Sequence, residues 1–306
     1  MGYSLSPEQV VLANMAGAVP ERRDEMKALW ERYHPEAIVT QDANHITLKA
    51  SKDRITFDAK TMEVFWLIGF SGWQAIKCYS PHVIASAALS TTIERVIEED
   101  EDLAEIELAY KERRAAAQSL IDATDPATVP WPPDLPRPNS NRDAFCDPQY
   151  KAAFDLTCLA VAFTLFHEFR HVMLDRDKQR PPDLREEELA CDVWARDFMT
   201  AKLAGYAREH GHDYHEVLRK RSMGFALTAL ILHEITPFWD HGGNHAYFSV
   251  ATRLKTILDN TSLPKNDDFW VFSASLLVGL FRQKGRTISA PPMAPRSLTS
   301  HLLADL

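Results

Sequence analysis

The feature that most constrains this chain is a long apolar segment, residues 155–174, with ionisable side chains near its end. Its sequence is DLTCLAVAFTLFHEFRHVML, and nearly every position before His167 is apolar. A helix that is apolar around most of its circumference belongs in the centre of a fold. His167, Glu168 and His171 would then be buried, which is costly for ionisable groups unless they are paired or bind a metal. The segment therefore predicts a buried helix that carries a metal site.

The spacing of these three residues indicates which metal chemistry to expect. His167 and His171 are four residues apart, so both imidazoles project from the same helix face and can reach one ion. Glu168 follows the first histidine directly and points to the side where a metal-bound water would lie. This is the HExxH arrangement, in which the glutamate is the general base. We predict about one zinc ion per chain, bound by His167 and His171.

A catalytic zinc site needs a third protein ligand, and the sequence offers four candidates. Asp177 has the spacing found in metzincins, but Leu174 stands where that group has a glycine. Glu188, on the following helix, is the favoured candidate. The remaining candidates are Cys191, as a soft ligand, and the histidines of the REHGHDYH turn: His210, His212 and His215.

The helix after the metal segment favours Glu188. Glu188, Asp192 and Ala195 fall on one face of the segment REEELACDVWARDF, residues 185–198. Glu188 and Asp192 are like charges at i and i+4, which repel each other on a solvent-exposed helix face. A nearby cation would compensate this repulsion. Glu188 can then bind the metal while Asp192 accepts a hydrogen bond from the second nitrogen of a ligand histidine. The small Ala195 lets this helix approach the first one.

The two glutamates that precede Glu188 have a different expected role, at the start of this helix. Asp183 can cap the helix, and Glu186 completes an Asp-x-x-Glu capping box. We therefore assign Glu186 and Glu187 to the first helical turn rather than to the metal site.

The rest of the chain predicts an α+β fold that is predominantly helical. Residues 45–60 alternate apolar and polar positions around Ser-Lys-Asp, as in a β-hairpin. A proline-rich linker at 124–141 separates an N-terminal helical and hairpin part, 1–123, from a helical metal-site half, 142–306, within one compact unit. The helices expected are 6–33, 61–77, 91–122, 148–176, 183–209, 213–235, 246–259 and 268–283.

Composition excludes several classes of function. A formal charge of −9 and a pI near 5.7 argue against nucleic-acid binding. The apolar runs FWLIGFSGW and GFALTALIL are too short to span a membrane. The start MGYSLSPEQV lacks the basic and apolar parts of a signal peptide, and the four cysteines form no CxxC pair. We therefore expect a cytoplasmic protein that binds neither membrane nor nucleic acid.

HExxH followed by ExxxD on the next helix resembles the gluzincin group of zinc peptidases. More narrowly, the chain is similar to the Lit-type phage-exclusion peptidases, through EVFWLIGFSGWQAI (63–76), LFHEFRHVMLD (165–175) and EEELACDVWARDF (186–198). The resemblance implies a zincin-like core with a small N-terminal sheet. The segment HAYFSVATRL, residues 245–254, resembles one that follows in such enzymes. By that resemblance His245 and Arg253 are candidate donors to the oxyanion, with Tyr247 as a substitute.

The resemblance implies a cytoplasmic bacterial zinc endopeptidase. In the Lit family the substrate is elongation factor Tu, which is cut upon phage infection. Because an unregulated protease of this kind would kill its host, we expect a latent state released by an activator, phage-derived or other. Two alternatives remain open: an ImmA-type peptidase that cleaves repressors of mobile elements, and a catalytically silent, metal-stabilised module that binds a protein.

Overall fold

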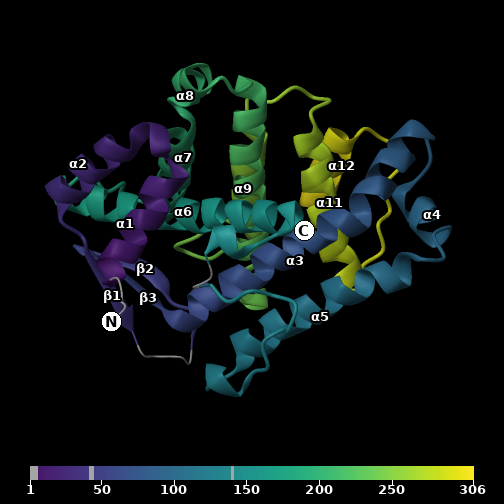
Figure 1. Ribbon diagram of the computed structural model, residues 1–306, viewed down its shortest axis with the longest axis horizontal. Helices are drawn as coiled ribbons and strands as arrows, with labels where there is room; N and C mark the ends of the chain where they lie inside the picture. Colours follow the sequence, from purple (N-terminus) through teal and green to yellow (C-terminus); the bar gives the residue numbers. More distant parts are fainter. Residues whose placement is uncertain (1–5, 41–44, 139–140) are drawn as a thin grey trace.

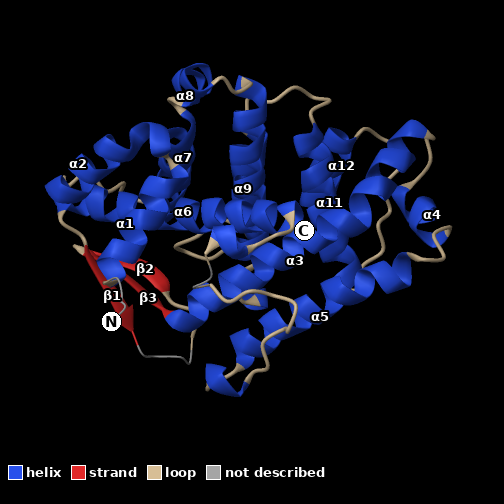
Figure 2. Cartoon of the chain, viewed as in Figure 1, coloured by secondary structure: helices blue, strands red, loops and turns tan. Residues whose placement is uncertain are grey.

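The structure of the chain, a computed structural model, describes residues 6–40, 45–138 and 141–306 (Figure 1). Helices dominate and the strands gather at one corner (Figure 2), so the predominantly helical α+β class is confirmed. The strands are β1 Glu36–Thr40, β2 Leu48–Ser51 and β3 Arg54–Asp58. The α-helices are α1 Pro7–Ala18, α2 Arg23–Tyr33, α3 Ala59–Ala88, α4 Ile93–Glu98, α5 Leu103–Asp122, α6 Pro148–Arg176, α7 Leu184–Thr200, α8 Leu203–His210, α9 Tyr214–Ile235, α10 Val250–Asp259, α11 Asp268–Gln283 and α12 Pro295–Ala304.

The predicted hairpin is present as β2 and β3, which pair in antiparallel register with Leu48 opposite Phe57. The sheet order is β1-β3-β2, so β2 forms one edge. β1 pairs with β3 in parallel and was not predicted. Its five residues are half-buried or exposed and show no clear alternation. As an edge strand, β2 has one side that is not paired with another strand, and this strand lines the candidate site.

Several helix boundaries differ from the predicted ones. α3 continues to Ala88 instead of ending at 77, the helix expected at 183–209 is divided into α7 and α8, and local breaks divide two others. The helix expected at 6–33 is divided into α1 and α2 by a 3-10 turn that begins at Pro20. Proline has no N–H to donate, and its ring restricts the preceding residue, so the helix ends before it. The helix expected at 91–122 is likewise divided, into α4 and α5. By contrast, α6 has the predicted bounds, with Pro148 at its first position and Asp147 capping Gln149 N at 2.8 Å.

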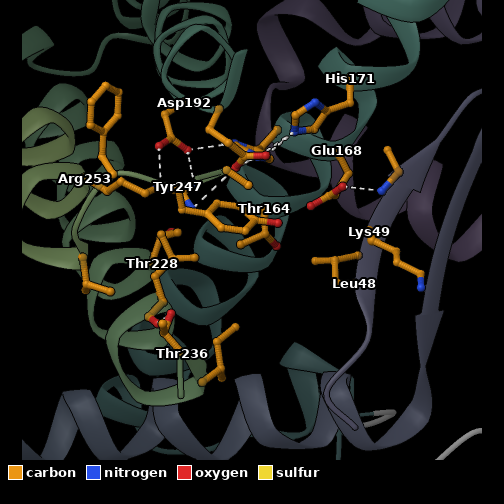
Figure 3. A pocket seen from close by; sticks show the side chains of 18 of the residues that line it. Leu48, Lys49, Thr164, Glu168, His171, Asp192, Thr228, Thr236, Tyr247 and Arg253 are labelled. Atoms are coloured by element: carbon orange, nitrogen blue, oxygen red, sulfur yellow. Dashed lines mark hydrogen bonds and ion pairs between the residues drawn. The ribbon is translucent and has the colours of Figure 1, made fainter. Parts of the chain in front are cut away.

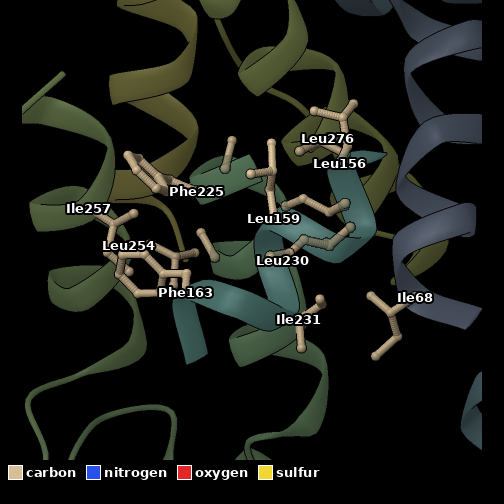
Figure 4. Packing of buried hydrophobic residues seen from close by; sticks show 14 of the residues in the cluster. Ile68, Leu156, Leu159, Phe163, Phe225, Leu230, Ile231, Leu254, Ile257 and Leu276 are labelled. Atoms are coloured by element: carbon tan, nitrogen blue, oxygen red, sulfur yellow. The ribbon is translucent and has the colours of Figure 1, made fainter. Parts of the chain in front are cut away.

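α6 is the central helix, packed against α3, α7 and α9. Glycines allow two of these approaches: a Cβ at Gly69 of α3 would lie 2.4 Å from Thr157 Oγ1, and one at Gly224 of α9 would lie 2.7 Å from Leu159 Cβ. Large side chains fill the remaining space, with Phe163 of α6 against Phe225 of α9 (Figure 4). This packing fixes the position of the metal segment from several sides.

Among the described residues, α6 alone is long and apolar enough to cross a membrane. However, 67% of its most apolar window is buried inside the protein, as in the core helix of a soluble protein. The proline-rich segment contains no α-helix or strand in its described part, and its residues 139 and 140 lie outside the described chain. It runs along α3, where Trp66 Nε1 donates to Pro136 O at 2.7 Å.

Candidate active site

α6 brings the two histidines of the HEFRH segment together. His167 and His171 lie one turn apart on the same face, and their Nε2 atoms are 3.1 Å apart. His167 is only 7% exposed, because α7 and α9 cover this part of α6. The sequence-predicted pair of imidazoles therefore forms one buried, convergent group.

α7 places Glu188 opposite this pair. Its Oε2 lies 3.3 Å from His167 Nε2 and its Oε1 lies 3.2 Å from His171 Nε2. One ligand atom from each of the three residues can be chosen so that all lie within 4.8 Å of one another. Ala195, fully buried on the same helix, permits the close approach of α7. His167, His171 and Glu188 are thus arranged to hold a single metal ion.

Asp192, one turn along α7, contacts His167 on the ring nitrogen that faces away from the metal group. Its Oδ1 lies 2.7 Å from His167 Nδ1, as the sequence predicted for the second nitrogen of a ligand. Arg253 of α10 donates from Nε and Nη2 to Asp192, both at 3.0 Å, and its Nη1 lies 3.6 Å from Glu188 (Figure 3). This bidentate arrangement fixes the carboxylate and, through it, the orientation of the imidazole.

Glu187 supports the second histidine, a role that sequence reasoning missed. Its Oε1 lies 2.7 Å from His171 Nδ1, and the residue is 3% exposed. Glu187 does lie in the first turn of α7, as predicted, but its exclusion from the metal site was wrong. The predicted capping box is also absent, because Asp183 caps Arg185 N at 2.8 Å and Glu186 is exposed. The available signal was the second histidine itself, whose free nitrogen also needs an acceptor.

The hydrogen bonds of this group show that it suits a cation. A neutral imidazole carries one N–H. Nδ1 of each ring lies 2.7 Å from a carboxylate oxygen, closer than Nε2 lies to Glu188, so in a neutral ring that proton belongs on Nδ1 and Nε2 presents a lone pair. Two lone pairs 3.1 Å apart, facing the Glu188 carboxylate, repel one another unless a positive charge lies among them. Imidazole nitrogens and a carboxylate are also the donors that zinc prefers.

The electrostatics of the group agree with this conclusion. Burial lowers the pKa of His167, but the Asp192 and Glu188 carboxylates outweigh it and raise that pKa to about 10. Burial raises the pKa of Glu188, and the hydrogen bonds from His167 and His171 more than reverse this and hold it below its usual range. Without a metal, protons would have to supply the positive charge that the donor set demands.

Glu168 lies beside this group, between α6 and the sheet. It accepts a hydrogen bond from Ala50 N of β2 at 2.5 Å. Burial raises its pKa, partly opposed by the neighbouring histidines. In an antiparallel pair only alternate residues exchange hydrogen bonds with the partner strand, so Leu48 and Ala50 share the edge that faces away from β3. The open edge of β2 therefore borders the site.

A cavity of about 440 Å³ connects these features. The two histidines, Glu168 and Glu188 line one side, and β2 lines another through Leu48, Lys49 and Ala50. Figure 3 shows Thr164, Thr228 and Tyr247 within it. Its apolar wall includes Ile46, Leu48, Phe65, Phe163, Leu232 and Ile235. A polypeptide placed along β2 would have its backbone beside Glu168 and side chains in this apolar space.

The other candidate ligands and His245 are not part of the metal group. His245 is exposed and does not line the cavity, whereas Tyr247, two residues on, does. Asp177 accepts a hydrogen bond from Tyr33 at 2.7 Å, and buried Cys191 lies outside the convergent group. The histidines of the turn between α8 and α9 are all exposed: His210, His212 and His215.

A family model named Peptidase U49 matches residues 55–273. The matched range contains both histidines, Glu168, Glu188, Asp192 and Arg253, and extends from β3 into α11. No curated protein matches the chain. No solved structure matches it either. Since the matched range covers most of the sequence, this chain belongs to the Peptidase U49 family.

Proposed function

We propose that this peptidase is a zinc-dependent endopeptidase. The observation that carries the proposal is the convergence of His167, His171 and Glu188 beside Glu168, with each histidine held by a buried carboxylate. Three protein ligands leave a position open for water, as catalytic zinc sites require. The HExxH helix, the glutamate helix and a sheet with its edge at the cavity would together form a zincin-like core.

Zinc bound by these three residues would supply a Lewis acid that activates water and polarises the scissile carbonyl. Glu168 is placed to take a proton from the attacking water and to pass it to the leaving amine. Its burial, which raises its pKa, makes it a stronger base than an exposed carboxylate. Its hydrogen bond to Ala50 N keeps the carboxylate at the boundary between helix and strand.

Tyr247 is the best-placed donor to the oxyanion that forms when water attacks. Burial and the charges of Glu188 and Glu168 raise its pKa, so the hydroxyl keeps its proton. It lines the cavity, whereas His245 does not. A donor that strengthens its hydrogen bond as negative charge develops lowers the barrier to the reaction.

The edge of β2 is suited to bind an extended substrate. Main-chain groups at Leu48 and Ala50 face the cavity, and β-strand addition uses such groups to hold a peptide backbone. Ala50 N would exchange its bond with Glu168 for one to the substrate. This exchange would free the carboxylate for proton transfer only when a substrate is present.

For the substrate and setting we propose the ones that the Lit-type resemblance implies. The enzyme would act in the bacterial cytoplasm on elongation factor Tu during phage infection, after release from a latent state. A repressor as substrate would instead make it an ImmA-type enzyme. Digestion of a bacterial lysate with the purified protein, followed by mapping of new peptide termini, separates these two substrates.

Glu168→Gln tests the mechanism. The substitution keeps the shape of the side chain and removes the proton acceptor, so we expect zinc to stay bound and cleavage to fall by about 10²–10⁴-fold. Zinc content and cleavage of elongation factor Tu, or of the target found in the lysate, are measured on the same preparation. Glu186→Gln, an exposed neutralisation on α7, is the control.

Two results would contradict the proposal. Full cleavage by a zinc-loaded Glu168→Gln protein would remove Glu168 from catalysis. Full biological effect without any cleavage would favour the module that only binds its target.

A further inference from the structure

Two adjacent aromatic side chains project into solvent at the rim of the cavity. Phe238 is 84% exposed and Trp239 is 81% exposed, on the 3-10 turn η4 Phe238–Asp240. The residues on either side of the pair, Pro237 and Asp240, line the cavity. Tyr247, 44% exposed, belongs to the same loop and lines the cavity too. Contiguous exposed apolar groups at a functional opening mark an interaction surface.

Hydrogen bonds hold the backbone of this turn in place. Asp240 N donates to Pro237 O at 2.9 Å, and His241 Nε2 lies 2.9 Å from Thr236 O, which makes it the donor. Asn244 joins the two ends of the loop: its Nδ2 donates to Asp240 Oδ1 at 3.0 Å and its Oδ1 accepts from Tyr247 N at 3.0 Å. The turn therefore presents its two aromatic groups in a fixed place.

The loop also closes tightly behind the pair. Gly243 has a φ of +85°, and a Cβ there would meet Ser249 N at 2.7 Å, so only glycine fits without strain. Val250 N donates to His241 O at 3.0 Å and ties the loop to the start of α10, the helix of Arg253. The loop that exposes Phe238 is therefore tied to the helix that carries Arg253.

We propose that Phe238 and Trp239 form an exosite that binds an apolar segment of the protein substrate, outside the residues that enter the cavity. The inference rests on the proposed endopeptidase function, since it extends the same substrate path. Tyr247 and Pro237 line the same cavity as β2 and the metal group, and Pro237 directly precedes the turn, so a chain bound in the cavity can extend to the aromatic pair. Tryptophan and other aromatic anchors supply much of the affinity in protein–protein recognition.

The chemistry of the patch specifies its partner. The exposed pair carries no charge, and the acidic residue that follows it in the chain, Asp240, is bonded to Asn244. The partner is therefore an apolar stretch of polypeptide rather than a basic or acidic one. Proteins with such a stretch near the scissile bond would be preferred over short peptides.

Direct binding tests the exosite independently of cleavage. The probe is fluorescently labelled β-casein, a disordered protein rich in apolar residues, added to the Glu168→Gln protein. Adding Phe238→Ser and Trp239→Ser to that protein should raise the Kd for β-casein by about tenfold, the loss expected from an aromatic anchor pair. Leu89→Ser is the matched control, because Leu89 is 71% exposed and lies outside the cavity. Equal melting temperatures should show that all variants fold.

The same pair is then compared in proteins with Glu168 intact. The double variant should raise KM for β-casein and leave kcat within about twofold, the pattern of lost uniform binding. Binding of β-casein that depends on the pair, without its cleavage, would support the exosite and exclude β-casein as a substrate, and the lysate digestion then tests the proposed function separately. Cleavage with equal KM in both proteins would support the function and overturn the exosite.

Three further results would overturn the exosite. The first is no binding of β-casein to the Glu168→Gln protein. The second is a dimer that the double variant converts to a monomer, and the third is binding to lipid vesicles that the double variant abolishes. The last two would assign the pair to a second copy of the chain or to a membrane.

Discussion

Two clusters of charged groups around buried carboxylates in this molecule are built differently. The first, here called the metal-site cluster, consists of His167, His171, Glu187, Glu188 and Asp192. The second, the α5 cluster, is centred on Glu107 and includes Tyr79, Lys111 and Arg282. Glu107 accepts from Tyr79 Oη at 2.7 Å, from Arg282 Nε at 2.6 Å and from Lys111 Nζ at 2.9 Å.

The difference lies in how each cluster satisfies its negative charge. In the α5 cluster, two cations and a hydroxyl surround one carboxylate. In the metal-site cluster, three carboxylates and two imidazoles converge. Among the described residues, buried Arg253 bonds to them and the more exposed Arg180 lies 3.7 Å from Glu187. A carboxylate with complete pairs can serve stability alone, whereas a cluster with an excess of negative charge favours a bound cation. The comparison therefore points to the same residues as the HExxH spacing, without reference to the family.

The largest expected effect concerns removal of the metal. A ligand that binds only the folded state stabilises it by about 4 kcal/mol at a thousand times its Kd. We therefore expect a chelator to lower the free energy of unfolding by about this amount in zinc-saturated protein. Chemical denaturation with and without chelator measures the change. His167→Ala should show no dependence on chelator, and an equally stable zinc-free wild type would contradict the comparison.

The α5 cluster should respond to Glu107→Gln and not to zinc. Charge-assisted hydrogen bonds to a buried group contribute roughly 1.5–3 kcal/mol, so we expect a loss of about 2–3 kcal/mol as Arg282 loses its partner. The variant should keep its zinc and its dependence on chelator. Loss of zinc in Glu107→Gln would show that the two clusters are coupled.

The same variant gives a pH dependence of known sign. Burial raises the pKa of Glu107, but the bonds from Arg282, Lys111 and Tyr79 outweigh it and lower that pKa from 4.5 to about 2. A lowered pKa stabilises the fold above pH 4.5, and the contribution is lost as the pH falls towards 2. The advantage of wild type over Glu107→Gln should therefore shrink at acid pH.

A smaller effect is expected from the carboxylates that hold the ligand histidines. Asp192→Ala should weaken zinc affinity or activity by about 10–100-fold, because His167 loses its fixed orientation. Glu187→Ala should do the same through His171, and Glu186→Ala, exposed on the same helix, should change neither. Competition with a chromogenic chelator measures the affinity. Wild-type zinc affinity in Glu187→Ala would show that Glu187 takes no part in the metal site, as the sequence indicated.

Sequence reasoning succeeded where the signal was local and periodic. α6 was predicted with its observed bounds because an apolar helix follows an Asp-Pro start, and its histidine spacing is a property of one helix. Asp192 followed from its spacing to Glu188 on α7. The hairpin followed from alternation on both sides of a short turn.

The failures depend on contacts between distant parts of the chain. β1 is a strand because it pairs in parallel with β3, and nothing in its five residues demands that partner. Glu187 contacts His171 because α7 crosses α6 at one particular rotation, which a helical pattern does not specify. The position of Tyr247 rather than His245 in the cavity depends on the Asn244 hydrogen bonds, which no spacing rule contains.

The measurement that tests the central claim most directly is the zinc content of a pair of variants two residues apart on α7. After dialysis, wild type and Glu186→Ala should each hold about one zinc ion per chain, and Glu188→Ala should hold almost none. Elemental analysis by mass spectrometry gives the ratio without any assumption about the substrate. Full zinc in Glu188→Ala, with loss in Asp177→Ala or Cys191→Ser, would contradict the assignment of the third ligand.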